Sequence, residues 1–143
     1  MVAVVVIAHE PLASALVTAA QHVYSRDPCA ASRQLAALDV PPDSDTAAAF
    51  TQARSLIQRV DQGQGVLVLT DVPGATPCNV AARLGQAGRV AVVAGVNMPM
   101  LLRTLCYGDL GLEELVEKAL AGGASGIQRL LPTPGPEAAS KTR

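Results

Sequence analysis

The chain has 143 residues, the size of one ordinary domain, and half of them are apolar although only 2% are aromatic. A core that must be built from Val, Leu, Ile and Ala is typical of a parallel sheet with helices on both faces. The formal net charge is −1, so no basic surplus is present to neutralise phosphates, and we expect no nucleic-acid partner.

Strand-like and helix-like segments alternate along the chain. Continuous Val-, Ile- and Leu-rich runs predict buried strands, and apolar residues at helical spacing predict the helices between them. In chain order, we expect four strands, at 2–8, 34–40 (the weakest pattern), 66–70 and 90–94. The first helix should run from Pro11 to about Tyr24, before Asp27-Pro28, and the second should be capped by Asp43, Ser44 or Asp45 and end at about Val60. A third helix should be capped by Thr76 and begin at Pro77, and two more should run from Met100 to about Tyr107 and from Leu112 to Ala121.

This alternation predicts an α/β fold with a doubly wound, mainly parallel sheet. Residues 126–131 are expected to add a short edge strand, antiparallel to the others, or a helical turn. The segment from Pro132 onward is rich in Pro and lacks apolar periodicity, so we expect a folded domain at 1–131 and a disordered tail at 132–143.

The cysteines and the first residues of the chain indicate the cellular compartment in which we expect the protein. Cys29, Cys78 and Cys106 are widely spaced and odd in number, so we expect no disulfide framework and a reducing environment. The apolar run at the start is too short to span a membrane and has no basic flank, so we do not expect it to be a signal peptide. We therefore expect a cytoplasmic protein.

Three loops, at His9 to Pro11, Asp71 to Pro77 and Gly95 to Pro99, are expected at the carboxyl ends of the strands, where open α/β sheets bind ligands. His9 follows the first strand and is a candidate nucleophile or general base. Asp71 follows the third strand and is placed to bond one ring nitrogen, which would fix the tautomer and leave the other nitrogen free. Gly74-Ala75-Thr76 leads into a helix N-terminus, which favours an anion. Together they suggest phosphoryl transfer through a phosphohistidine.

Simpler interpretations compete with this hypothesis. A lone His after a strand is more often a polar loop residue, Asp71 is also a common turn former, and Thr76-Pro77 is an ordinary helix start. His22 lies within a predicted helix and is expected at its surface. The sequence has neither GxGxxG nor GxxxxGK[ST], and no cluster with zinc-ligand spacing, so we expect no cofactor and no metal.

Three stretches identify a known family when taken together. They are Val4-Val-Val-Ile-Ala-His9, Val68-Leu-Thr-Asp-Val-Pro-Gly-Ala-Thr-Pro-Cys-Asn79 and Val93-Ala-Gly-Val-Asn-Met-Pro-Met-Leu-Leu102. With these, the chain resembles the enzyme IIA component of the mannose-type (mannose/fructose/sorbose) phosphotransferase system from Met1 to about Leu131.

The resemblance implies a role for each site residue and a set of partners. His9 matches the phosphorylated histidine, Asp71 the acid that orients it, and Thr76 stands where the family usually has Ser beside the phosphate. The family takes phosphate from phospho-HPr, passes it to a IIB domain for sugar uptake, and meets the membrane only through a permease complex. It is typically a homodimer whose last strand is exchanged or packed across the interface, an element that residues 126–131 would supply.

Two departures from the family pattern keep alternatives open. Glu10 stands where Gly often follows the histidine, and Ala75 replaces a Gly that could adopt positive φ, so the loop must use an ordinary conformation or accept strain. No IIB portion follows in the sequence. A regulatory module that binds a partner according to its phosphorylation state, and the phosphocarrier subunit of a dihydroxyacetone kinase, are therefore retained, although Asn97-Met-Pro99 favours the mannose type.

Overall fold

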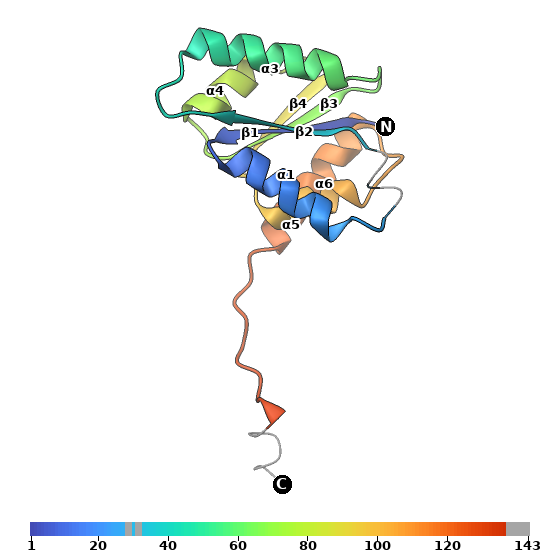
Figure 1. The fold of residues 1–143 in the computed structure, drawn as a ribbon. Helices are drawn as coiled ribbons and strands as arrows, with labels where there is room; N and C mark the ends of the chain where they lie inside the picture. The colour runs from blue at the N-terminus through green and yellow to red at the C-terminus, as the bar shows by residue number, and fades with distance from the viewer. Residues whose placement is uncertain (28–29, 31–32, 137–143) are drawn as a thin grey trace.

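A computed structural model describes residues 1–27, 30 and 33–136. Four strands form one sheet in the order β2-β1-β3-β4, and every neighbouring pair is parallel. Helices cover both faces of this sheet, as Figure 1 shows. The elements are β1 (Ala3–His9), α1 (Leu12–Val23), β2 (Leu35–Val40), α3 (Thr46–Val60), β3 (Val66–Thr70), α4 (Thr76–Arg83), β4 (Val90–Ala94), α5 (Met98–Leu105) and α6 (Leu112–Ser125).

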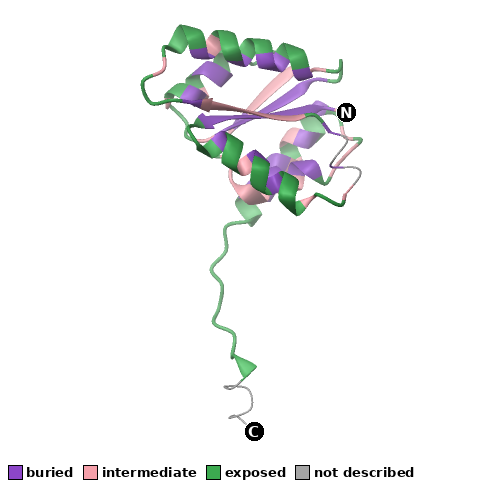
Figure 2. Ribbon diagram, in the orientation of Figure 1, coloured by how far each residue is buried: buried purple, intermediate pink, exposed green. Residues whose placement is uncertain are grey.

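The alternation of side chains along β1 divides the core into two layers. Val4 and Val6 pack with α1, α5 and α6 on one face, whereas Val5 and Ile7 pack with α3 and α4 on the other. The two central strands, β1 and β3, are almost fully buried, and the outer strands β2 and β4 are mostly half-buried (Figure 2). A continuous apolar run is what a strand needs when helices cover it on both sides.

The chain changes direction in the sheet between β1 and β3. After β1 it crosses through α1 to β2 on one side, and β3 leads through α4 to β4 on the other side. The loops after β1 and β3 therefore diverge to opposite faces at the carboxyl ends of these strands, which is where ligands bind in such sheets. His9 ends β1 and Asp71 follows β3, so both lie at this switch point.

The predicted α/β fold with its parallel sheet is confirmed, and β3 and β4 have the expected bounds. Three helix starts differ from the prediction. Pro11 precedes α1 rather than beginning it, Ala75 and not Thr76 caps α4, and α5 begins at Met98 because the Asn97 side chain accepts a hydrogen bond from the N–H of Met100. Of the three candidate caps for α3, Asp45 is the one used.

Residues 126–131 do not form the expected edge strand within the single chain. Helix α6 continues to Ser125, Gly126 forms a turn, and residues 127–131 are in neither helix nor strand, so within the described residues the sheet gains no antiparallel edge strand. From there the chain leaves the body of the molecule up to residue 136, as Figure 1 shows. Helix α1 already ends at Val23, while Pro28, Cys29 and residues 137–143 lie outside the described residues.

Candidate functional site

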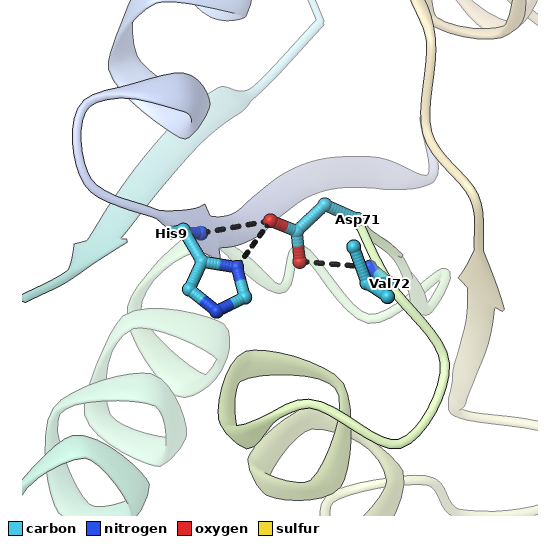
Figure 3. Close-up of polar contacts among 3 residues, drawn as sticks. All are labelled: His9, Asp71 and Val72. Carbon is cyan, nitrogen blue, oxygen red and sulfur yellow. Dashed lines mark hydrogen bonds and ion pairs between the residues drawn. The ribbon is translucent and has the colours of Figure 1, made fainter. Parts of the chain in front are cut away.

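His9 and Asp71 are brought together by two hydrogen bonds across the switch point. The ring Nδ1 of His9 lies 2.6 Å from Oδ2 of Asp71, and the backbone N–H of His9 donates to the same oxygen at 3.0 Å (Figure 3). The backbone N–H of Val72 donates to the other carboxylate oxygen at 2.9 Å. Asp71 thus holds both the main chain and the ring of His9, which fixes the position of the side chain.

The surroundings of Asp71 favour its ionised form. Burial alone raises the pKa of this carboxyl group, since its side chain is only 7% exposed, but the hydrogen bonds from the ring and backbone of His9 and from Val72, with the charge of His9, outweigh burial. The net result is that the pKa of Asp71 is lowered from its ordinary value of 3.8. A carboxylate in this position also stabilises positive charge on the imidazole ring.

The second ring nitrogen of His9 is available for chemistry. With Nδ1 donating to Asp71, the neutral ring has its lone pair on Nε2, and Figure 3 shows this nitrogen directed away from Asp71. The His9 side chain is 48% exposed, so an incoming reactant can reach it. An oriented, exposed imidazole nitrogen is suited to act as a nucleophile.

The four helices that begin at this edge of the sheet differ in how their N-termini are occupied. The side chain of Asp39 accepts from the first turn of α1, that of Asp45 from α3 and that of Asn97 from α5. For α4, no side chain within the described residues caps the first turn. The N-terminus of α4, next in sequence after the Asp71 loop, is therefore open to an external anion.

The predicted phosphate loop has an ordinary backbone. Gly74 has a φ of 87°, whereas Ala75 has a φ of −81° in the extended region, so Ala75 introduces no strain. The amide of Asn79 donates to the carbonyl of Gly74, and the N–H of Ala75 donates to the carbonyl of Val72, which together close the loop. Thr76, exposed, is the first residue of α4. Within the described residues, no hydrogen bond joins His9 to Gly74, Ala75 or Thr76.

Several supporting contacts were not predicted from the sequence. The N–H groups of Gly95 and Val96 donate to the carbonyls of Asp71 and Thr70, which fastens the loop after β4 to the loop after β3. Asp39 bonds the first turn of α1 through Ser14. The first pair is backbone to backbone, and the second joins residues 25 positions apart, so neither leaves a signal in local sequence patterns.

Among the described residues, His22 and Cys78 form no hydrogen bond with His9 or Asp71. His22 is exposed on α1, as expected, and Cys78 is half-buried in α4. No group of three or more metal-binding side chains occurs among the residues that the structure describes. In the same part of the chain, no helix combines the length and the apolar character that a membrane crossing requires.

Comparison with known proteins relates this geometry to a family. The family model described as "PTS system fructose IIA component" matches residues 3–120. The chain is 32% identical over 105 residues to the mannose-specific EIIAB component of the phosphotransferase system from Escherichia coli K12, a match that covers 71% of this chain and 32% of that protein. It therefore spans about a third of the length of this curated relative.

Solved structures share the fold over almost the whole length. The mannose/sorbose-specific IIA subunit from Enterococcus faecalis has a TM-score of 0.79 at 22% identity, and the match covers 92% of this chain and 97% of that one. A IIA protein associated with the fucose utilization operon of Streptococcus pneumoniae has a TM-score of 0.68 at 26% identity, covering 85% and 93%. The chain belongs to the mannose-type IIA family of the phosphotransferase system.

Proposed function

We propose that this IIA component carries a phosphoryl group on Nε2 of His9, taken from the phosphohistidine of phospho-HPr and passed to a IIB domain during sugar uptake. The observation that carries the proposal is the 2.6 Å contact between His9 Nδ1 and Asp71 Oδ2, which leaves Nε2 as the exposed nucleophile. The family supports the two partners in general terms.

The transfer needs no oxidant, metal or cofactor. The lone pair of His9 Nε2 attacks the phosphorus atom, an N–P bond forms, and the N–P bond to the donor's imidazole breaks with its electron pair returning to the donor nitrogen. The ring of His9 becomes positively charged in this step, and the Asp71 carboxylate at Nδ1 stabilises that charge. Phosphoryl transfer depends mainly on such positioning and electrostatic stabilisation.

The loop from Gly74 to Thr76 is the proposed binding site for the phosphoryl oxygens. The uncapped N-terminus of α4 offers backbone N–H groups and the positive end of the helix dipole, and the exposed hydroxyl of Thr76 adds a further donor. Ala75 keeps the chain extended just before the helix, so the loop retains this arrangement without a second Gly.

The effect of Glu10 on this chemistry follows from its charge. Glu10 is exposed, and its backbone N–H donates to the carbonyl of Val40. A carboxylate one residue from His9 repels an incoming phosphoryl group, but the interaction passes through solvent and is screened by salt. Glu10 therefore slows the approach of the donor modestly without preventing it.

A homodimer is the proposed assembly. Ile127, Leu130 and Leu131 are 78%, 82% and 75% exposed, which is unusual for three large apolar side chains in so short a segment. Strand β4 lies at an edge of the sheet, and among the described residues only its first residue, Val90, is bridged on the outer side, by Gln86. An exchange of residues 127–131 between two copies would cover both features, and the strand that the single chain lacks would then form only in the dimer.

Labelling with isotopic phosphate tests the proposal. The protein is incubated with enzyme I, HPr and labelled phosphoenolpyruvate, and phosphorylated protein is quantified for the wild type, His9→Gln and His22→Gln. We expect label on the wild type and on His22→Gln, and none on His9→Gln. Unlabelled wild-type protein, or equal labelling of His9→Gln, would show the proposal to be wrong.

The regulatory module is a second candidate, because the contact between His9 and Asp71 favours phosphorylation of His9 whether or not the phosphoryl group is then passed on. Such a protein would accept phosphate on His9 without donating it. Incubation of the phosphorylated protein with a mannose-type IIB domain separates the two functions, because only a transport component loses its label to IIB. If the label is transferred instead to a nucleotide bound to dihydroxyacetone kinase, the protein is the phosphocarrier subunit of that kinase.

A further inference from the structure

A second carboxylate lies at the same edge of the sheet and takes no part in the proposed chemistry. Asp39 is the residue before the last of β2, where it pairs in register with Ala8, and it is half-buried. Its Oδ2 accepts a hydrogen bond from the hydroxyl of Ser14 at 2.5 Å, and its Oδ1 accepts from the backbone N–H of Ser14 at 3.0 Å. Both bonds join β2 to the first turn of α1.

Helix α1 depends on Asp39 because it has no cap of its own. The residue at its N-cap position is Pro11, which offers no side-chain acceptor, and Ser14 is the third residue of the helix. Its N–H is one of the groups that a helix leaves unpaired at its start. Asp39 therefore replaces a local N-cap from a strand 25 positions further along the chain.

The turn that carries His9 is fastened to β2 at both of its ends. At the first end, His9 pairs in register with Val40, and the N–H of Glu10 donates to the carbonyl of Val40 at 3.0 Å. At the second end, Asp39 holds Ser14, whose hydroxyl also lies 3.3 Å from the carbonyl of Pro11. Only Glu10 and Pro11 lie between the strand and the helix, so a shift of the helix start would move His9.

We infer that Asp39 is a positioning residue for His9, acting through Ser14 on the turn between β1 and α1. With this anchor on the β2 side and Asp71 on the β3 side, the backbone of His9 is held from both neighbouring strands. The ring then stays within hydrogen-bond distance of Asp71 while Nε2 remains directed outward. The expected effect of Asp39 on the phosphorylation rate rests on the proposed function of His9. Its expected effect on the orientation of the His9 ring does not.

The chain offers a matched control at the same edge of the sheet. Asp45 caps α3 by accepting from the N–H of Ala47 at 3.3 Å, yet it lies after β2 and not beside His9. Asp39→Ala and Asp45→Ala each remove a carboxylate from one helix start, so both should lower the melting temperature by a few degrees. Only Asp39→Ala should change the chemistry of His9. Asp39→Asn keeps an acceptor for the Ser14 N–H and should restore most of the lost rate. If Asp39→Ala fails to fold, Ser14→Ala removes only the hydrogen bond between the Ser14 hydroxyl and Asp39.

Two measurements on the full chain test the inference. The first is the rate of His9 phosphorylation, with phospho-HPr and separately with phosphoramidate, a small donor that needs no docking. We expect Asp39→Ala to lower the maximal rate about tenfold with either donor and with unchanged KM for phospho-HPr, because misplacing a reacting group by about an ångström costs rate rather than binding. Ser14→Ala should lose about threefold, and Asp45→Ala should match the wild type.

The second measurement is the nitrogen NMR spectrum of the His9 ring in the unphosphorylated protein. The wild type and Asp45→Ala should show a single tautomer with the proton on Nδ1, whereas Asp39→Ala should show a mixture. The inference would be overturned if Asp39→Ala had wild-type rates and spectra and lost only as much stability as Asp45→Ala, because Asp39 would then act only as a helix cap. If no protein donor labels the wild type, the proposed function fails, while the spectrum and the phosphoramidate rate still decide the role of Asp39.

Discussion

At the residue scale, Asp71 ionises readily although it is almost buried, because three donated hydrogen bonds outweigh the cost of burial. Its role as the partner of His9 was predictable from the sequence, since both residues follow neighbouring parallel strands. The two backbone donors were not predictable, because any residue at positions 9 and 72 other than Pro would supply the same N–H group. The same holds for Asp39 and Ser14, which nothing in the local sequence connects.

The lowered pKa of Asp71 makes part of the stability depend on pH. A group with a depressed pKa in the folded state stabilises the fold above its unfolded value, here 3.8, and this contribution is lost as the pH falls through the folded value. Asp71→Asn should therefore lower the free energy of unfolding by about 1–3 kcal/mol at pH 7, and by less at pH 3, which lies below the unfolded value. Urea unfolding at both pH values measures this, with the exposed Asp43→Asn as a control that should change little. Equal stability of Asp71→Asn and wild type at pH 7 would contradict the assignment.

Gly74 is the loop position at which backbone conformation restricts the choice of residue. Its φ is 87°, and an added Cβ would meet nothing within 4 Å, so a substitution there is strained by the backbone alone. Gly74→Ala should destabilise the protein by about 1–2 kcal/mol. Gly74→Asn should cost less, because Asn tolerates the left-handed region better. Thermal or urea unfolding compares the two, and equal losses would mean that the strain lies elsewhere.

At the scale of elements, the buried strands were the most predictable parts. Their apolar runs are bounded by Gly, Pro and Asp, and β3 and β4 were predicted to the residue. The helix starts were displaced because capping depends on which side chain reaches the first turn. Asn97 moves the start of α5 to Met98, and α6 continues beyond Ala121 through two glycines that would ordinarily end a helix.

Those glycines lie where α6 packs closely against α5. A Cβ on Gly122 would lie 2.5 Å from the Cβ of Arg103, whereas a Cβ on Gly123 would meet the flexible end of Met100 at 2.8 Å. Gly122→Ala should therefore destabilise the protein by about 1–3 kcal/mol, although Ala favours a helix by about 1 kcal/mol. Gly123→Ala, in which Met100 can move aside, should be nearly neutral. A stabilised Gly122→Ala variant would contradict the close packing of the two helices.

At the scale of the whole molecule, the four-stranded parallel sheet and its two helical layers followed from the alternating pattern of the chain. The segment after α6 did not, because an apolar segment becomes a strand only if the chain brings it alongside an edge of the sheet. Residues 127–131 have apolar side chains but no partner strand among the described residues of a single chain. Local pattern alone gives no information about pairing between copies.

The proposed dimer predicts a change of mass when this segment is altered. Light scattering after size-exclusion chromatography should give twice the chain mass for the wild type, and the chain mass for Leu130→Asp combined with Leu131→Asp. Circular dichroism should be nearly unchanged, because α6 already ends at Ser125. A wild-type protein that is monomeric at micromolar concentration would exclude the exchange of residues 127–131.

The contact between Asp71 and His9 should direct the phosphoryl group to one nitrogen of the ring. The protein is produced with nitrogen-15 in its histidines and is then phosphorylated. Phosphorus and nitrogen NMR spectra of this sample identify which ring nitrogen is bonded to phosphorus. Because Nδ1 is 2.6 Å from Asp71, the phosphoryl group should be on Nε2 of His9, with the proton retained on Nδ1. A phosphoryl group on Nδ1 of His9, or on His22, would contradict the account.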